Sequence, residues 1–228
     1  MKLLAIDAAT EACSVALSFN GEIYEEHFVA PRGHAQHLLS MVDRLLSAAD
    51  ISLSQLDAIA FDRGPGSFTG IRVGTSVTQG LAFGADLPVI PVSSLLILAQ
   101  GVYRELGETQ VLSVIDARMD EVYWACHRLN NGVMELLEKE YLSQPDEVTS
   151  DLEGKWYGAG TGWAQYGDIL SARLPKSCAG IDGQRLPRGC DILPLAEIQY
   201  QHKNFVSAEQ ALPVYLRNEV AKKPSRVL

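Results

Sequence analysis

Short apolar runs alternate with turn residues along the first part of the chain, a pattern typical of β-strands. The second and third runs are joined by Asn20-Gly21, the residue pair typical of a two-residue hairpin. The predicted strands are residues 3–7, 13–19, 22–28 and 58–61. Two segments in which apolar side chains recur three and four positions apart, residues 34–50 and 69–84, are predicted helices.

The same order of elements returns later in the chain. Asp116 lies 109 residues after Asp7, each at the end of an apolar run, and Asn131-Gly132 lies 111 residues after Asn20-Gly21. A second strand over 121–126 and a strand, glycine turn and helix within 156–170 complete the repeat. The series predicts a duplicated α/β fold of two lobes, each with a mixed β-sheet flanked by helices. The predicted divisions are residues 1–105, 106–212 and a C-terminal segment 213–228 that returns to the first lobe and ends in a frayed basic tail.

Composition limits the classes of function. The 228 residues carry a net charge of −9, which disfavours a chain that grips nucleic acid by itself. No apolar run is long enough for a membrane span, so we expect no membrane association. Four cysteines without paired or metal-type spacing indicate reduced thiols in a cytoplasmic protein. The Gly-, Pro- and Arg-rich residues 175–194 are predicted to be an irregular surface segment.

The most informative segment is Arg-Gly-Pro-Gly-Ser-Phe-Thr-Gly-Ile-Arg-Val-Gly, residues 63–74. Gly64, Pro65 and Gly66 indicate a tight structural loop between a strand and a helix, and Ser67 or Thr69 is suited to cap that helix. The alternative is a phosphate-binding loop, but the spacing is wrong and no lysine follows. We therefore favour the structural turn.

The helix predicted over residues 69–84 places small residues near one face. Gly70, Gly74 and Gly84 lie there together with Val77 and Leu81. Each glycine costs roughly 1 kcal/mol of helix stability relative to alanine, and close packing would offset that cost. The sequence leaves open whether the close neighbour belongs to this chain or to a partner.

Four segments together resemble the bacterial TsaB family, also called YeaZ. They are residues 7–17, 63–74, 115–119 and 213–218. The resemblance implies the duplicated actin/Hsp70/sugar-kinase fold and a role in forming threonylcarbamoyladenosine in tRNA, beside the anticodon. It implies a non-catalytic accessory subunit that forms a heterodimer with TsaD and activates it. The resulting complex also recruits TsaE, and this chain reaches tRNA only through that complex. It also implies self-association into a homodimer through the same helical surface.

The sequence departs from the catalytic relative TsaD at the motifs that carry chemistry. TsaD has a histidine-rich metal motif where this chain has Val89–Ile97, which offers no imidazole or carboxylate, so we expect no metal site. Sugar-kinase-like phosphate loops contain glycine where this chain has alanine after Asp7, and the loop after Asp116 also lacks glycine. We therefore expect that this chain alone binds no cofactor. Alternatives stay open for Asp7 and Asp116: each caps its loop, or both face the cleft between the lobes, where paired carboxylates could hold a metal or act as acid and base. If ATP or ADP lies at the joint with TsaD, Glu11 and Arg118 are the best candidate contacts, together with these two carboxylates.

We expect the two predicted helices to form the partner interface. The candidate contacts, chosen from helical spacing, are His37, Met41, Leu45, Gly70, Gly74, Thr75, Thr78 and Gln79. The rival hypothesis is a stand-alone ATP-dependent kinase or ATPase of the same superfold, which needs glycines in both phosphate loops. A peptidase would need a metal site or an activated nucleophile, and the sequence has neither motif.

Overall fold

The first lobe is built on a five-stranded mixed sheet in the order β3-β2-β1-β4-β5. The computed structural model describes residues 1–29, 34–150, 152–174 and 176–217. Strands β1 to β3 form an antiparallel meander, whereas β1, β4 and β5 are parallel. Their bounds are Leu3–Asp7 for β1, Ala12–Phe19 for β2, Glu22–Val29 for β3, Ala58–Asp62 for β4 and Val89–Val92 for β5.

The second lobe repeats this arrangement, with the order β11-β10-β6-β7-β8 and β9 also paired to β7. The bounds are Gln110–Arg118 for β6, Glu121–Asn130 for β7, Val133–Leu136 for β8, Tyr141–Ser143 for β9, Trp156–Ala159 for β10 and Cys178–Asp182 for β11. Both predicted Asn-Gly turns have positive φ at both residues: 52° and 82° at residues 20 and 21, and 48° and 87° at residues 131 and 132. The predicted duplicated two-lobed fold is confirmed.

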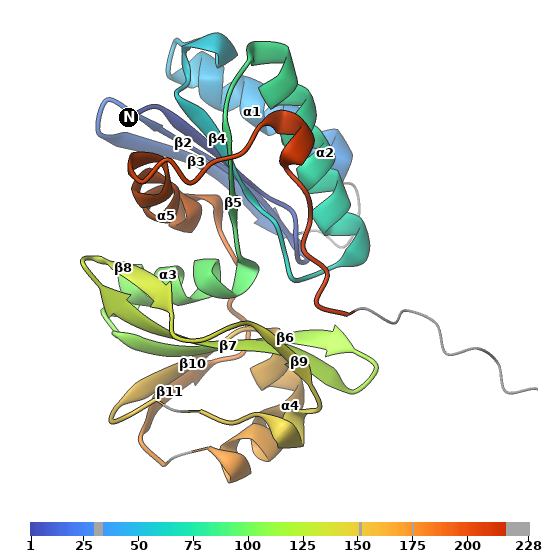
Figure 1. Ribbon diagram of the computed structural model, residues 1–228, viewed down its shortest axis with the longest axis vertical. Coiled ribbons are helices and arrows are strands. Elements are labelled where there is room, and N and C mark those ends of the chain that lie inside the picture. The colour runs from blue at the N-terminus through green and yellow to red at the C-terminus, as the bar shows by residue number, and fades with distance from the viewer. Residues whose placement is uncertain (30–33, 151, 175, 218–228) are drawn as a thin grey trace, which may run out of the picture.

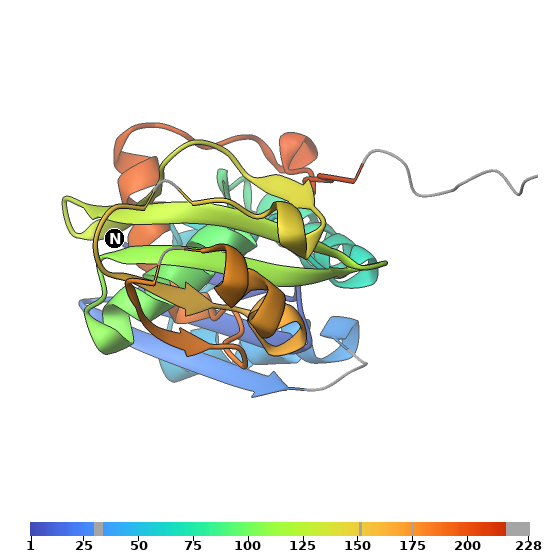
Figure 2. The same cartoon turned by 90° about the horizontal axis from the view of Figure 1, so that it is seen from below.

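Helices cover the faces of both sheets (Figure 1). On the first sheet, α1 (His34–Ala48) and α2 (Phe68–Ala85) pack on one face and α5 (Gly189–Gln201) on the other. On the second sheet, α4 (Thr161–Arg173) packs on the outer face, while α3 (Ser94–Leu106) lies between the lobes against α5. Three single 3-10 turns are η1 (Leu53–Gln55), η2 (Pro145–Glu147) and η3 (Ala208–Gln210). Figure 2, seen from below, shows the second lobe in front of the first.

The segment from residue 175 to 194 differs from the prediction. It contains β11 and the first half of α5 rather than irregular chain. The chain also returns to the first lobe earlier than residue 213, because α5 packs on the first sheet through Ile192, Leu193 and Ala196. Gly189 allows this approach, since a Cβ there would lie 2.9 Å from the backbone nitrogen of Ala16 on β2.

Among the described residues, no helix combines the length and apolar character that a bilayer crossing requires. The predicted basic tail, residues 218–228, lies outside the described part of the chain.

Candidate functional site

Two carboxyl groups meet at the ends of neighbouring parallel strands. Asp7 ends β1 and Asp62 ends β4, and both side chains are buried. Asp7 accepts a hydrogen bond from the backbone N–H of Ala9, and Asp62 accepts from Gly64 N–H and from the Ser94 hydroxyl at 2.6 Å. The two carboxyl groups also lie within hydrogen-bonding reach of each other. They therefore hold the loops after β1 and β4 together.

Burial and proximity change the acidity of this pair. Burial, followed by the neighbouring Asp62 carboxylate, raises the pKa of Asp7 well above its usual value. Burial raises the pKa of Asp62 to about 6, against the opposing effect of the Ser94 and Gly64 hydrogen bonds. Asp7 does not line the cleft between the lobes, so its place among the cleft candidates was wrong. Asp62 was missed, although it ends an apolar strand as Asp7 does.

The glycine loop packs directly on the loop after β1. The backbone N–H of Ser67 donates to the carbonyl of Ala9 at 2.7 Å, and a Cβ at Gly66 would lie 2.2 Å from the same carbonyl oxygen. Ser67 caps α2, its hydroxyl accepting from Gly70 N–H. These contacts support the structural-turn interpretation, because the loop needs its glycine for close packing and uses the Ser67 N–H internally.

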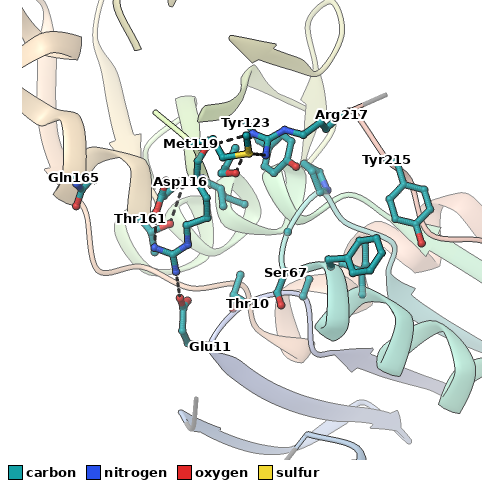
Figure 3. Close-up of a pocket in the computed structure, with 18 of the residues that line it drawn as sticks. Thr10, Glu11, Ser67, Asp116, Met119, Tyr123, Thr161, Gln165, Tyr215 and Arg217 are labelled. Carbon is teal, nitrogen blue, oxygen red and sulfur yellow. Dashed lines mark hydrogen bonds and ion pairs between the residues drawn. The ribbon is translucent and has the colours of Figure 1, made fainter. Parts of the chain in front are cut away.

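A cleft of about 760 Å³ separates the lobes, and the two helices α2 and α4 begin at its edge (Figure 3). Glu11, Asp116 and Arg118 line it as predicted. Asp116 accepts from the Arg118 backbone N–H and guanidinium, at 2.9 and 2.8 Å, which matches the loop-cap alternative. The Arg118 guanidinium also reaches Glu11 across the cleft at 3.5 Å. A nucleotide contact by these residues stays a prediction.

Ligands for a metal ion are scarce in this part of the structure. The segment Val89–Ile97 forms β5, the Ser93 cap of α3 and buried core positions. Across the described ranges, no three His, Cys, Asp or Glu side chains are grouped so that they could hold a metal ion. The cleft offers mainly hydroxyl, amide, arginine and aromatic groups.

Most of the predicted interface residues lie inside the chain, which corrects that part of the sequence analysis. Met41 and Leu45 are buried in the core under α1, and Thr75 and Thr78 are buried on the inner face of α2. Gly70 and Gly74 pack against Ala8, and a Cβ at Gly70 would lie 2.1 Å from the Ala8 carbonyl oxygen. The close neighbour of this glycine face is therefore the chain itself. Of the eight candidates, His37 is exposed and Gln79 is partly buried.

The exposed outer face of α2 carries apolar groups that sequence analysis did not select. A shallow groove is lined by Phe68, Thr69, Arg72, Val73, Ser76 and Val77. Nearly two turns further along the helix, the Phe83 side chain is 72% exposed, and positions 80 and 84 are glycines with no atom near the place of a Cβ. We call this surface the outer α2 face. The signal available in the sequence was the presence of phenylalanines at both ends of a helix otherwise rich in small residues.

Comparison with known proteins gives one consistent family. Residues 28–222 match the family model described as "TsaD: tRNA N6-adenosine threonylcarbamoyltransferase". The chain is 45% identical to the "tRNA threonylcarbamoyladenosine biosynthesis protein TsaB" of Escherichia coli, with 98% of this chain and 97% of that protein covered. It is 40% identical to the protein of the same name from Haemophilus influenzae, over 98% and 96%. The solved structure of YeaZ from Pseudomonas aeruginosa is 49% identical, with a TM-score of 0.89 and coverage of 94% and 99%.

Proposed function

The chain belongs to the TsaB (YeaZ) family, and we propose that it serves in tRNA threonylcarbamoyladenosine biosynthesis as the accessory subunit that binds and activates TsaD. The proposed reaction is transfer of the threonylcarbamoyl group to the adenosine beside the anticodon. In this proposal TsaD performs the chemistry and this chain none.

The observation that carries the proposal is the outer α2 face. It presents the exposed Phe68 and Phe83 side chains and open glycine positions, with partly buried valines along the groove, on a helix whose other face is already packed on the first sheet. An exposed apolar helix face with space at its glycines suits the close approach of another helix. Helix α1 packs beside α2 and extends the same side of the lobe, so we propose a helix-pair interface in which His37 also takes part.

Two features of the cleft support a non-catalytic role. The glycine loop uses the Ser67 N–H on the Ala9 carbonyl, whereas a nucleotide-binding loop directs its N–H groups toward phosphate oxygens. Asp7 and Asp62, the carboxyl groups at the ends of β1 and β4, are buried beside each other and do not line the cleft. We propose that ATP or ADP contacts this chain only at the joint with TsaD, that TsaE joins the same complex, and that tRNA is reached through the complex.

The proposal is tested by Phe83→Asp. Because Phe83 is 72% exposed, the substitution leaves the core intact and places a charge on the apolar face. We expect affinity for TsaD, measured by titration calorimetry, to fall at least about tenfold, with a matching fall in threonylcarbamoyl transfer to tRNA. The matched control is Ile169→Asp, an apolar helical residue that is 45% exposed on α4 of the other lobe. Equal affinity of Phe83→Asp and wild type would remove the outer α2 face from the interface.

The same variant examines the homodimer. If a second copy of the chain uses the outer α2 face, Phe83→Asp shifts the protein to monomer in sedimentation experiments, and TsaD competes with self-association.

A separate titration of the isolated chain with Mg-ATP distinguishes the rival stand-alone kinase or ATPase, which requires micromolar binding without TsaD.

A further inference from the structure

After η3, residues 211–217 run along the first lobe and end on the second lobe (Figures 1 and 3). We call these residues the C-terminal strap. The Ala211 carbonyl accepts a hydrogen bond from the Gln79 amide on α2, and the backbone N–H of Val214 donates to the Arg63 carbonyl, both at 2.9 Å. The strap is thus fixed to the first lobe at two points.

Arg217 attaches the other end of the strap to the turn between β6 and β7 (Figure 3). Its Nη2 donates to the carbonyl oxygens of Ala117 and Arg118, at 3.1 and 3.2 Å, and to Glu121 Oε2 at 2.5 Å. The Arg217 side chain is only 16% exposed. Three acceptors on one turn make this the principal contact of the strap with the second lobe, and charge-assisted bonds of this kind are the stronger hydrogen bonds in proteins.

The turn that Arg217 holds has an unusual backbone. Arg118, Met119 and Asp120 have φ values of 61°, 57° and 60°, although none of them is glycine. Such left-handed residues are uncommon singly and cost conformational energy, so a run of three needs contacts that fix it. Asp116 caps the turn from within the second lobe, and Arg217 binds two of its carbonyl groups from outside.

Between its two attachments, the strap contributes to the outer α2 face. The Tyr215 hydroxyl accepts a hydrogen bond from Arg72 Nε at 2.9 Å, and the Tyr215 ring centre lies 6.1 Å from that of Phe68. The Arg72 guanidinium lies 3.5 Å from the Phe68 ring centre. Phe68 and Arg72 line the groove on α2. Tyr215, which is 43% exposed, therefore extends this groove toward the second lobe.

We propose that the C-terminal strap is an interlobe latch in which Arg217 is a positioning residue: by binding the β6–β7 turn it holds Tyr215 against Phe68 and Arg72, and so completes the docking surface for TsaD. This inference rests on the proposed function and adds a partner surface formed by both lobes. Affinity for TsaD then depends on the contact between Arg217 and Ala117, two residues that are 100 positions apart in the sequence.

The test combines hydrogen exchange and binding on the full chain with Arg217→Ala, Arg217→Lys and Tyr215→Ala. We expect Arg217→Ala to speed amide exchange of residues 118–121 and 214–216 about tenfold, and to weaken TsaD binding by a similar factor. Tyr215→Ala weakens binding without changing exchange of the β6–β7 turn. Arg217→Lys restores part of both properties, because an ammonium group can satisfy some of the three acceptors. Arg173→Ala, which removes an exposed arginine on α4, is the matched control and leaves both unchanged.

A double variant identifies whether Arg217 acts through Tyr215. The affinity lost in Arg217→Ala/Tyr215→Ala should be no greater than in Tyr215→Ala alone. Unchanged exchange of residues 118–121 in Arg217→Ala, or fully additive losses of affinity, would overturn the latch. If Phe83→Asp abolishes TsaD binding while the Arg217 variants bind normally, the latch fails and the proposed function stands. If Phe83→Asp also binds normally, the docking face itself is wrong.

Discussion

Replacing Asp7 by asparagine tests the most unusual electrostatic feature of the fold. The Oδ2 atoms of Asp7 and Asp62 are both buried, and neither has a hydrogen-bond donor when both groups are ionised. Because the two side chains are within hydrogen-bonding reach, one proton between them satisfies both atoms. The direction of the shift favours Asp7 as the protonated partner, because burial and then the Asp62 carboxylate raise its pKa. In Asp7→Asn, the amide N–H₂ can replace this proton permanently, while its carbonyl oxygen still accepts from Ala9 N–H.

The sign of the effect follows from the direction of the pKa shift. A carboxyl group with a raised pKa in the folded state contributes stability that is fully present below its unfolded pKa, near 3.8, and is lost as the pH rises through the folded value. The loss for one proton is about 1.4 kcal/mol per pH unit. As the pH rises above the unfolded value, Asp7→Asn should therefore gain stability relative to wild type, by at most about 1.4 kcal/mol for each pH unit until the folded pKa is passed. Asp62, whose pKa is about 6, and the nearby Glu140 remain in both proteins.

The assay is urea denaturation at half-unit steps from pH 5 to pH 8, with the free energy of unfolding compared between variants. Asp43→Asn is the control, because it makes the same chemical change at a carboxyl group that is exposed on α1. It should follow the wild-type pH profile. Cys13, whose thiol pKa is raised to about 12 by burial and by Asp7, does not titrate in this range. Parallel pH profiles for wild type and Asp7→Asn would show that no proton is shared at this site.

Two further predictions concern packing and a buried histidine. Gly66→Ala and Gly70→Ala should each destabilise the protein by about 2 kcal/mol or more, because the new Cβ would lie 2.2 or 2.1 Å from a backbone carbonyl oxygen. Gly80→Ala, where no atom lies near the new Cβ, should stabilise the protein by up to about 1 kcal/mol. Equal urea midpoints for all three would contradict this explanation of the glycines. His127 is fully buried, and burial lowers its pKa to about 3, so its ring resonances should not move between pH 5 and pH 8 in NMR spectra. The stability that this neutral ring provides is present above pH 6.5 and is lost as the pH falls toward 3, and a ring that titrates near neutrality would refute the assignment.

The repeat was predictable because its signals are local. Apolar strands that end in aspartate and Asn-Gly turns with positive φ identify both meanders without knowledge of the neighbouring chain. Segment 178–201 was not predictable in this way. Pro194 lies inside α5, and Gly189 occupies its first position, so residues that normally interrupt structure are here accommodated by packing on β2. Tertiary contacts overrode the local preference.

The prediction of which side of α2 is exposed was wrong for a different reason. Its inner face holds Gly70, Gly74 and the buried Ile71, while its exposed outer face holds Phe68 and Phe83. Because both faces carry apolar as well as small residues, the hydrophobic pattern alone does not identify the face that packs on the sheet. What selects the inner face is distance: with a Cβ at Gly70, the helix could not approach the Ala8 carbonyl.

The close approach of α2 to the sheet connects the glycine loop, the cleft and the outer α2 face. The loop after β1 lies so close to the start of α2 that the Ala9 carbonyl accepts the hydrogen bond of the Ser67 N–H. The same carbonyl leaves no room for a side chain at Gly66. Space for phosphate groups between these loops would require α2 to move away from the sheet. In this structure the glycine loop holds α2 against the loop after β1 through these contacts. A helix fixed on its inner side by backbone contacts can keep Phe68 and Phe83 on its outer side, and the proposed docking to TsaD depends on that property.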